Sequence, residues 1–250
     1  MIRIENIEKS FLGAKVLLGV SAEFYEGKTN LIIGQSGSGK TVLLKCIVGL
    51  NQPDNGSVFY DDRNYSLANF KTKKAIREEI GMIFQGSALF TSETIQDNVM
   101  FPMEMFGNQS KKEKLLRVNQ CLERVGISGT NHLFPGELSG GMQKRAAIAR
   151  AIVLNPKYLF CDEPNSGLDP KTSLKIDELI SNITKDYNIT TIINTHDMNS
   201  VMQIGENILF LNNGVKDWEG TNKVMFDSDS ETFNSFVFAS EMAKLLKQKQ

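Results

Sequence analysis

A glycine-rich segment at residues 34–41, Gly-Gln-Ser-Gly-Ser-Gly-Lys-Thr, restricts the fold of this chain more than any other feature. It follows the apolar run Leu31–Ile33, which predicts a buried strand, and leads into Thr41–Leu50, whose apolar residues have helical spacing. Glycines at these positions let successive backbone N–H groups face one point, where the N-terminus of the helix adds partial positive charge. The segment therefore predicts a strand–loop–helix unit that binds the phosphates of a nucleoside triphosphate.

The residue types in this segment suit that chemistry. We expect Lys40 to reach the β- and γ-phosphates and the Thr41 hydroxyl to bind Mg²⁺. A tight strand–helix turn followed by a lysine is the purely structural alternative, and the strand and helix signals on either side disfavour it. The predicted nucleotide-binding residues are Gly34, Gln35, Ser36, Gly37, Ser38, Gly39, Lys40, Thr41 and Val42.

A pair of acidic residues follows a second predicted strand. Tyr158–Cys161 is apolar and aromatic, and it ends in Asp162 and Glu163. At a strand tip beside the phosphate loop, Asp162 would hold Mg²⁺, and Glu163 would polarise a water that attacks the γ-phosphate. Alone, such a pair is usually a solvated turn, so the catalytic interpretation depends on the upstream phosphate loop.

Strand and helix signals alternate along most of the chain and define the fold class. Residues 1–30 contain short alternating runs that suggest antiparallel strands, and residues 92–155 are mainly helical in pattern. Strand signals return at 158–161 and at Thr190–Asn194, each after a helical segment, and Asn213-Gly214 predicts the turn of a terminal hairpin. This alternation predicts an α/β fold with a parallel sheet covered by helices.

Composition excludes several classes of protein. The 250 residues are 41% hydrophobic and 23% charged, which excludes disorder or coiled coil as the main state. The net charge of −1 argues against a nucleic-acid-binding protein, which usually carries a basic surplus. No apolar run approaches the ~18 residues of a membrane-spanning helix, and the start lacks the pattern of a signal peptide. Three widely spaced cysteines predict reduced, buried thiols, and we expect a cytoplasmic protein.

A second glycine motif precedes the Ala- and Arg-rich segment Ser139–Leu154. Leu138-Ser139-Gly140-Gly141-Met142-Gln143 would place free N–H groups and a small hydroxyl at a helix N-terminus, which forms a second anion site. In isolation, a simple helix cap is the better interpretation. Here the motif lies about 20 residues before the acidic pair, so its context favours a second phosphate contact.

Together these motifs resemble the ATP-binding subunit of ABC transporters over nearly the whole chain. The phosphate loop, Gln85, the Leu138–Gly141 signature, the acidic pair, Ser166–Asp169 and His196 stand in the order of that family. The resemblance implies an α/β ABC ATPase fold: a RecA-like P-loop core with a parallel sheet, an antiparallel β subdomain and a helical subdomain. It implies one domain over 1–250, with 1–85 and 156–226 as the core, 86–155 as the helical part and 227–250 as a helical tail.

The resemblance also implies a head-to-tail dimer that sandwiches two ATP molecules with Mg²⁺. Each ATP would lie between the phosphate loop of one copy and the signature of the other. The implied catalytic residues are Glu163, His196 and Gln85; the metal ligands are Thr41, Gln85 and Asp162; the signature contacts are Ser139, Gly140, Gly141 and Met142.

Four further residues lie outside these sets. The resemblance puts Asp169 at the dimer interface and makes Phe11 the aromatic residue that stacks on adenine. Tyr25 is the alternative for stacking, and a core position in a strand is the alternative role of Phe11. His132 matches no motif and is expected in a surface loop.

Within the family, the sequences of three segments resemble those of the Mla/MCE-type phospholipid transport ATPases: Gly81–Phe90, Asn98–Met103 and Thr195–Met198. This implies an integral membrane permease and an MCE-type lipid-binding protein as partners, with the chain peripheral on the inner face of the cell membrane and no nucleic acid bound. The alternatives are the ATPase of another ABC importer, for instance of polar amino acids, or a non-transport ABC ATPase. The non-transport classes fit less well, because the chain lacks a coiled-coil insertion and has one set of motifs.

Two apolar segments allow two interpretations each. The residues Phe90, Met100, Phe101, Met103, Met105 and Phe106 would either form the core of the helical part or line a groove near Gln85 that holds a permease helix. We expect about half of them in the groove. Glu231–Gln250 has an amphipathic pattern and would pack on its own subunit or dock on a partner.

Overall fold

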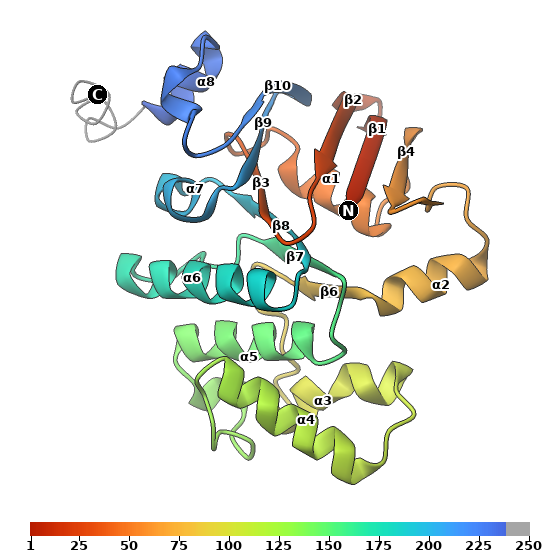
Figure 1. Ribbon diagram of the computed structural model, residues 1–250, viewed down its shortest axis with the longest axis vertical. Coiled ribbons are helices and arrows are strands. Elements are labelled where there is room, and N and C mark those ends of the chain that lie inside the picture. Colours follow the sequence, from red (N-terminus) through yellow and green to blue (C-terminus); the bar gives the residue numbers. More distant parts are fainter. Residues whose placement is uncertain (239–250) are drawn as a thin grey trace.

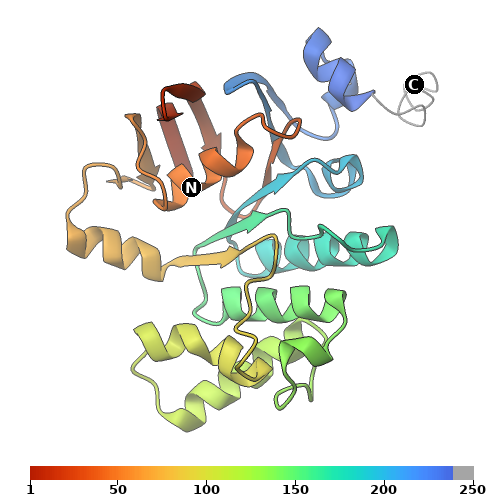
Figure 2. The same cartoon turned by 180° about the vertical axis from the view of Figure 1, so that it is seen from behind.

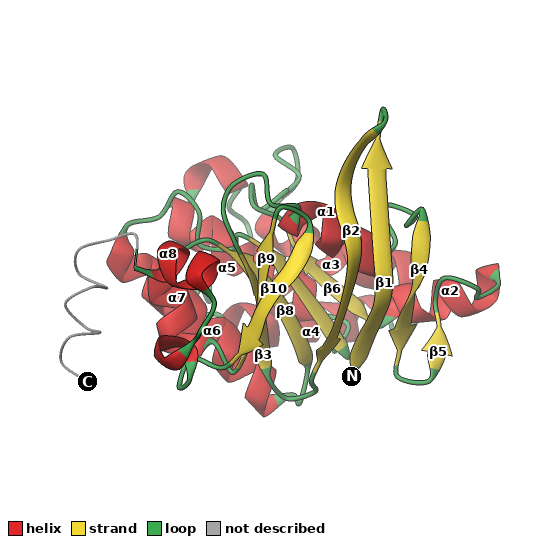
Figure 3. Cartoon of the chain, turned by 90° about the horizontal axis from the view of Figure 1, so that it is seen from above, coloured by secondary structure: helices red, strands yellow, loops and turns green. Residues whose placement is uncertain are grey.

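The computed structural model describes residues 1–238 and arranges them as two sheets with helices between and below them (Figure 1). The smaller sheet is antiparallel, in the order β2-β1-β4-β5. Its strands are β1 (Ile2–Phe11), β2 (Ala14–Phe24), β4 (Asn55–Tyr60) and β5 (Arg63–Asn64). Figure 3 shows this sheet beside the larger one.

The larger sheet has the order β10-β9-β3-β8-β7-β6, and only β10 runs antiparallel to its neighbour. Its strands are β3 (Thr29–Ile33), β6 (Ile80–Ile83), β7 (Tyr158–Asp162), β8 (Thr190–Thr195), β9 (Asn207–Asn212) and β10 (Val215–Gly220). The β9–β10 turn is Asn213-Gly214, with both residues at positive φ, as the hairpin prediction requires.

The helices are α1 (Lys40–Val48), α2 (Phe70–Glu78), α3 (Ile95–Phe106), α4 (Lys111–Arg124), α5 (Gly140–Ile152), α6 (Pro170–Asp186), α7 (Met198–Ile204) and α8 (Glu231–Val237). Short 3-10 turns lie at Pro135–Glu137 and Met225–Asp227. In Figure 2, α2 leads directly into β6, and α3 and α4 lie at the end of the molecule farthest from β1 and β2.

Two apolar cores lie on opposite faces of the larger sheet. In β3, Leu31 and Ile33 face the core formed with α3 to α6, whereas Ile32 faces the core shared with α1 and the smaller sheet. Period-two alternation explains this division, because successive side chains of a strand point to opposite faces. Both faces are covered, which is why the central strands are apolar at consecutive positions.

The observed elements agree with the predicted α/β class and refine its boundaries. Residues 66–79 have a charged sequence that predicts a helix, and α2 begins only at Phe70, because the Asn69 side chain caps the helix by accepting a bond from the Thr72 N–H. The helical stretch 92–155 breaks into α3, α4 and α5. Ser110 starts α4 through a reciprocal capping box with Glu113.

Other predictions concern cysteines, membrane spans and the C-terminal segment. All three cysteines are free and buried, as expected. Within residues 1–238, no helix is long and apolar enough to cross a membrane. The C-terminal pattern forms α8, where Phe233 is buried against Trp218 and Phe210 of the same chain, so this part packs on its own subunit. Met242, Leu245 and Leu246 of that predicted helix lie outside the described residues.

Candidate functional site

The phosphate loop connects β3 to α1 at the carboxyl edge of the parallel strands. Two of its glycines have backbone conformations that exclude a side chain. Gly34 has φ +151°, and a Cβ there would lie 2.2 Å from the carbonyl oxygen of Leu211. Gly39 has φ +102° and begins α1, with the Val16 carbonyl 3.2 Å from the position of a Cβ. The loop is therefore shaped by backbone packing against neighbouring strands.

Lys40 lies over this loop. Its Nζ donates hydrogen bonds to the carbonyl oxygens of Gly34 and Gln35, each at 2.9 Å. Burial lowers the pKa of Lys40, and the nearby carboxylates of Glu163 and Asp162 oppose that effect. The two hydrogen bonds hold the side chain at the mouth of the loop, where it can bind a phosphate oxygen.

Asp162 and Thr41 offer a suitable set of ligands for Mg²⁺. The Thr41 hydroxyl donates to Asp162 Oδ1 at 3.1 Å, and Asn194 Nδ2 donates to the same oxygen at 3.1 Å. Within residues 1–238, no cluster of three His, Cys, Asp or Glu side chains could hold a metal alone. Mg²⁺ commonly takes one or two protein oxygens and completes its shell with water and phosphate oxygens, so these residues fit it.

Glu163 is the centre of the polar contacts in the site. Its carboxylate accepts a bond from Gln85 Nε2 at 3.0 Å, and its other oxygen lies 2.9 Å from His196 Nδ1. Parallel pairing brings these residues together, because β6, β7 and β8 end side by side and Gln85, Glu163 and His196 each follow one of them. Glu163 has φ +47°, an uncommon conformation for a side-chain-bearing residue that is found at functional sites.

A pocket of about 670 Å³ joins these groups. It is lined by Val16, Gln35, Ser36, Gly37, Gly39, Lys40, Thr41, Val42, Gln85, Glu163, His196 and Phe236. The phosphate loop, the catalytic candidates and two of the three predicted metal ligands, Thr41 and Gln85, thus share a single cavity. Ser38 is buried nearby, and its hydroxyl has no hydrogen-bond partner in the described structure.

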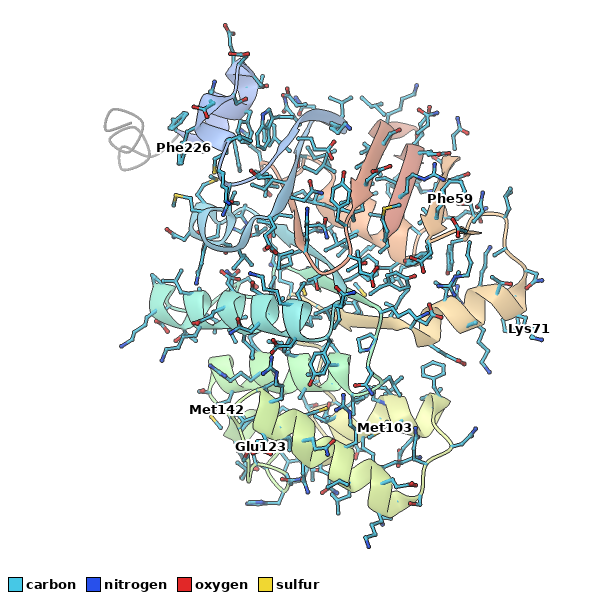
Figure 4. The ribbon with its side chains drawn as sticks, in the orientation of Figure 1. Phe59, Lys71, Met103, Glu123, Met142 and Phe226 are labelled. Carbon is cyan, nitrogen blue, oxygen red and sulfur yellow. The ribbon has the colours of Figure 1, made fainter. Side chains whose placement is uncertain are left out.

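The signature motif lies elsewhere on the same chain. Ser139 caps α5 by accepting a bond from the Met142 N–H at 3.3 Å, and Figure 4 labels Met142 near this end of the helix. Gly140 and Gly141 lie against Leu168 and Thr172, beside the start of α6. Among the described residues, none of 139–142 lines the pocket. One copy therefore presents its phosphate loop and its signature at separate places.

The remaining predicted residues lie outside the nucleotide pocket. Asp169 is exposed and caps α6 through the Thr172 N–H, and these hydrogen bonds lower its pKa. Phe11 is 43% exposed at the end of β1 and does not line the pocket. Tyr25 lines a different pocket with Arg3 and Glu23. His132 is exposed in a loop, as expected.

Three residues of the site were not predicted from the motifs. Asn194 is buried and bonds Asp162, and only its position at the tip of a predicted strand could have indicated it. Lys144 on α5 donates to the carbonyl oxygen of Gln85, and burial lowers its pKa while Glu163 opposes the change. This contact of Lys144 could not be predicted, because a lysine in an Ala/Arg-rich helix usually points to solvent. Phe236 reaches the pocket from α8, which no local pattern predicts.

Comparison with known proteins identifies the family. The model of the ABC transporter family matches residues 17–166. The chain belongs to the ABC transporter family. It is an ATP-binding subunit with ATPase activity, and its nucleotide is ATP with Mg²⁺. The predicted cassette fold and enzyme class are confirmed.

Several relatives have names. The chain is 44% identical over 214 residues to the methionine import ATP-binding protein MetN of Clostridioides difficile, covering 86% of this chain and 66% of MetN. It is 39% identical over 248 residues to MetN of Clostridium acetobutylicum, covering 99% and 74%. It is 35% identical over 238 residues to the probable ribonucleotide transport ATP-binding protein mkl of Mycobacterium leprae, covering 94% and 68%. The chain thus spans 66–74% of the length of these curated relatives.

Solved structures support the same fold. The dimeric structure of MJ0796, a bacterial ABC transporter cassette, matches with TM-score 0.81 and 32% identity over 89% of this chain and 99% of that one. A dimeric post-hydrolysis state of MJ0796 with ADP and Pi matches with TM-score 0.80 and 32% identity, with the same coverage. The cbiO1 protein of Clostridium perfringens, part of the cbiONQ complex, matches with TM-score 0.84 and 28% identity over 98% of each chain.

These relatives do not support the predicted phospholipid subfamily. Those named above include two methionine importers and a ribonucleotide transporter, and their names give no support to a phospholipid substrate or an MCE-type partner. They favour the alternative, another ABC importer. The segments that resembled Mla/MCE-type ATPases include parts of β6 and α3 and the β8–α7 junction.

Proposed function

We propose that this chain is the motor subunit of an ABC importer, in which two copies pair head to tail around ATP and drive a membrane permease. The observation that carries the proposal is the Glu163 carboxylate, which contacts both Gln85 and His196 in the pocket of the phosphate loop. The residues 1–85 and 156–226 would bind nucleotide, 86–155 would carry the signature, and 227–250 would form a C-terminal tail. Through the permease, the chain would sit on the inner face of the membrane.

The geometry supports a separate role for each of these residues in ATP hydrolysis. Glu163 would orient and deprotonate the attacking water, because its carboxylate is fixed from two sides. His196 would contact the γ-phosphate, and Gln85 would reach both the water and Mg²⁺. Lys40 would neutralise charge on the β- and γ-phosphates. Bound Mg²⁺, held by Thr41 and Asp162, would supply further charge neutralisation.

A second copy would complete each site. The exposed start of α5 offers backbone N–H groups and the Ser139 hydroxyl, but it lies outside the pocket of its own chain. In a head-to-tail pair, Ser139, Gly140, Gly141 and Met142 would face the ATP bound by the other copy, with Asp169 at the interface. The dimeric MJ0796 cassette has the same fold, which supports this arrangement. ATP would hold the pair together, and hydrolysis would release it. Phe11 would stack on adenine at the edge of the site.

An apolar groove next to Gln85 supports a permease contact. The groove has a volume of about 300 Å³ and includes Phe84, which precedes Gln85 in the chain. Of the six Phe and Met residues considered for this role, Phe90, Phe101 and Phe106 line it. Met100 and Met103 are buried in the core instead. A helix of the permease in this groove would be coupled to the catalytic residues through Gln85.

The substrate class follows from the relatives. We assign methionine or a similar amino acid, because two of the named relatives are methionine import ATP-binding proteins and align with most of this chain. The partners of the chain would be a permease and a substrate-binding protein, and no nucleic acid would bind.

The catalytic role is tested by Glu163→Gln, which keeps the size of the side chain but replaces one acceptor oxygen by an NH2 group and removes the base. We expect kcat for MgATP to fall about 100- to 10,000-fold while ATP still binds. The matched control is Glu178→Gln on the exposed face of α6, which should keep wild-type turnover. Wild-type turnover in Glu163→Gln would refute the role of Glu163.

The substrate is tested separately. The complex is captured from membranes through this chain, reconstituted in proteoliposomes and assayed for ATP-driven uptake of labelled methionine. Uptake that disappears with Glu163→Gln supports the importer. Transfer of labelled phospholipid without methionine uptake would contradict the substrate assignment and leave the ATPase assignment intact.

A further inference from the structure

A closed set of buried polar contacts lies next to the nucleotide site. The carboxylate of Asp177 on α6 is 1% exposed and accepts hydrogen bonds from the Ser200 hydroxyl at 2.6 Å and from Asn165 Nδ2 at 3.2 and 3.3 Å. Asn165 Nδ2 also donates to Ser200 Oγ at 2.9 Å. Each of the three side chains thus contacts the other two, and all three are buried.

The three residues come from segments that carry catalytic candidates. Asn165 is two residues after Glu163, in the loop that leads to Asp169. Ser200 lies on α7, four residues after His196. Asp177 lies in the middle of α6, which packs on α7 and begins at the cap Asp169. The contacts of Asp177 therefore tie the Glu163 segment to the His196 segment through a helix.

Burial of a carboxylate among neutral groups is unfavourable for stability alone. An apolar residue of similar volume would avoid the desolvation cost, so a buried charge without an ionic partner is weak support for the fold. The carboxylate of Asp197 also acts on Asp177 electrostatically, which makes the environment of a charged Asp177 less favourable still. What the Asp177 carboxylate does provide is directional hydrogen bonds to two separate segments, those of Asn165 and Ser200.

We propose that Asn165, Asp177 and Ser200 form a positioning triad that fixes Glu163 and His196 relative to each other during ATP hydrolysis. The inference rests on the catalytic roles proposed above. None of the three lines the nucleotide pocket as described, so the triad acts on the reaction through Glu163 and His196 rather than on ATP. Its loss lowers kcat and leaves the KM for ATP nearly unchanged, because misplacement of catalytic groups affects the chemical step.

The test uses Ser200→Ala and Asp177→Asn in the full-length chain. Both should lower kcat for MgATP about tenfold or more, with KM within about twofold of wild type. Ser200→Thr, which keeps a hydroxyl, should recover most of the lost kcat. The matched control is Thr184→Val on α6, the helix that carries Asp177. It removes a buried hydroxyl that is hydrogen-bonded to Thr191 Oγ1 at 2.6 Å. It should lower the melting temperature and keep wild-type kcat.

Thermal unfolding of every variant identifies a temperature at which all are folded, and kinetics are measured there. Wild-type kcat in both Ser200→Ala and Asp177→Asn would overturn the inference, as would an equal fall in kcat in Thr184→Val. Glu163→Gln is assayed in parallel. Its inactivity beside fully active triad variants refutes the triad alone, whereas wild-type turnover in Glu163→Gln refutes the proposed function and the triad with it.

Discussion

Asp177 makes the stability of the chain depend on pH in a direction opposite to that of most carboxylates. Burial raises the pKa of Asp177 to about 6, and the charge of Asp197 adds to this, while the hydrogen bond from Ser200 opposes it. An unfolded aspartate titrates near pH 3.8. The folded chain therefore binds this proton more tightly, so the contribution of Asp177 to stability is greatest below about pH 4 and is lost as pH rises through about 6.

The size of the effect follows from these two values. A difference of about two pKa units corresponds to about 3 kcal/mol over the full titration. Between pH 5 and pH 8, linkage gives a loss of about 1.4 kcal/mol in the free energy of unfolding. Carboxylates with lowered pKa, such as Asp61 and Asp54, contribute stability that is lost only at lower pH, so they do not titrate in this window.

Urea unfolding of wild type and Asp177→Asn at pH 5 and pH 8 measures this contribution. The difference between the two proteins should change by about 1.4 kcal/mol between the two pH values, with the wild type relatively more stable at pH 5. Glu178→Gln, a change at the neighbouring exposed residue, should follow the wild-type pH dependence. Equal pH dependence in wild type and Asp177→Asn would refute the argument.

Three further outcomes are expected. Lys40→Ala should weaken ATP binding about 10- to 100-fold in a fluorescent-nucleotide titration, because charge-assisted bonds to phosphate are lost; unchanged affinity would contradict the site. Phe233→Ala should lower the free energy of unfolding by about 3–5 kcal/mol and change the fluorescence of Trp218, which stacks on Phe233 at 4.0 Å between ring centroids. The single tryptophan makes this signal unambiguous. The buried thiols, with pKa values raised by burial, should react about a hundredfold more slowly with a thiol reagent at pH 8 than in urea, and equal rates would contradict their burial.

The sequence predicted those parts of the site that depend on short motifs at element boundaries. The loop at 34–41 lies between a strand and a helix, and Asp162 and Glu163 lie at a strand tip, because local patterns determine such positions. Parallel pairing of β6, β7 and β8 then brings Gln85, Glu163 and His196 together. The alternating strand and helix signals predict a parallel sheet but not this order of its strands.

Contacts between distant segments could not be predicted in this way. Lys144 reaches the Gln85 carbonyl across 59 residues, and Asn165 meets Ser200 across 35. Their local sequence is that of an ordinary helix or loop, and only the packing of α5, α6 and α7 reveals their partners. The identity of the transported substrate could not be predicted from the motifs either. They bind ATP, which is the same whatever is transported.

The head-to-tail composite site is the central claim, and mixing two inactive variants tests it most directly. Lys40→Ala disables the phosphate loop, and Ser139→Arg disables the signature, so each homodimer lacks a complete site. An equimolar mixture contains heterodimers in which one of two sites combines an intact loop with an intact signature, which predicts recovery of up to about a quarter of wild-type ATPase activity. No recovery in a mixture whose heterodimers are demonstrated by differential tags would contradict the account.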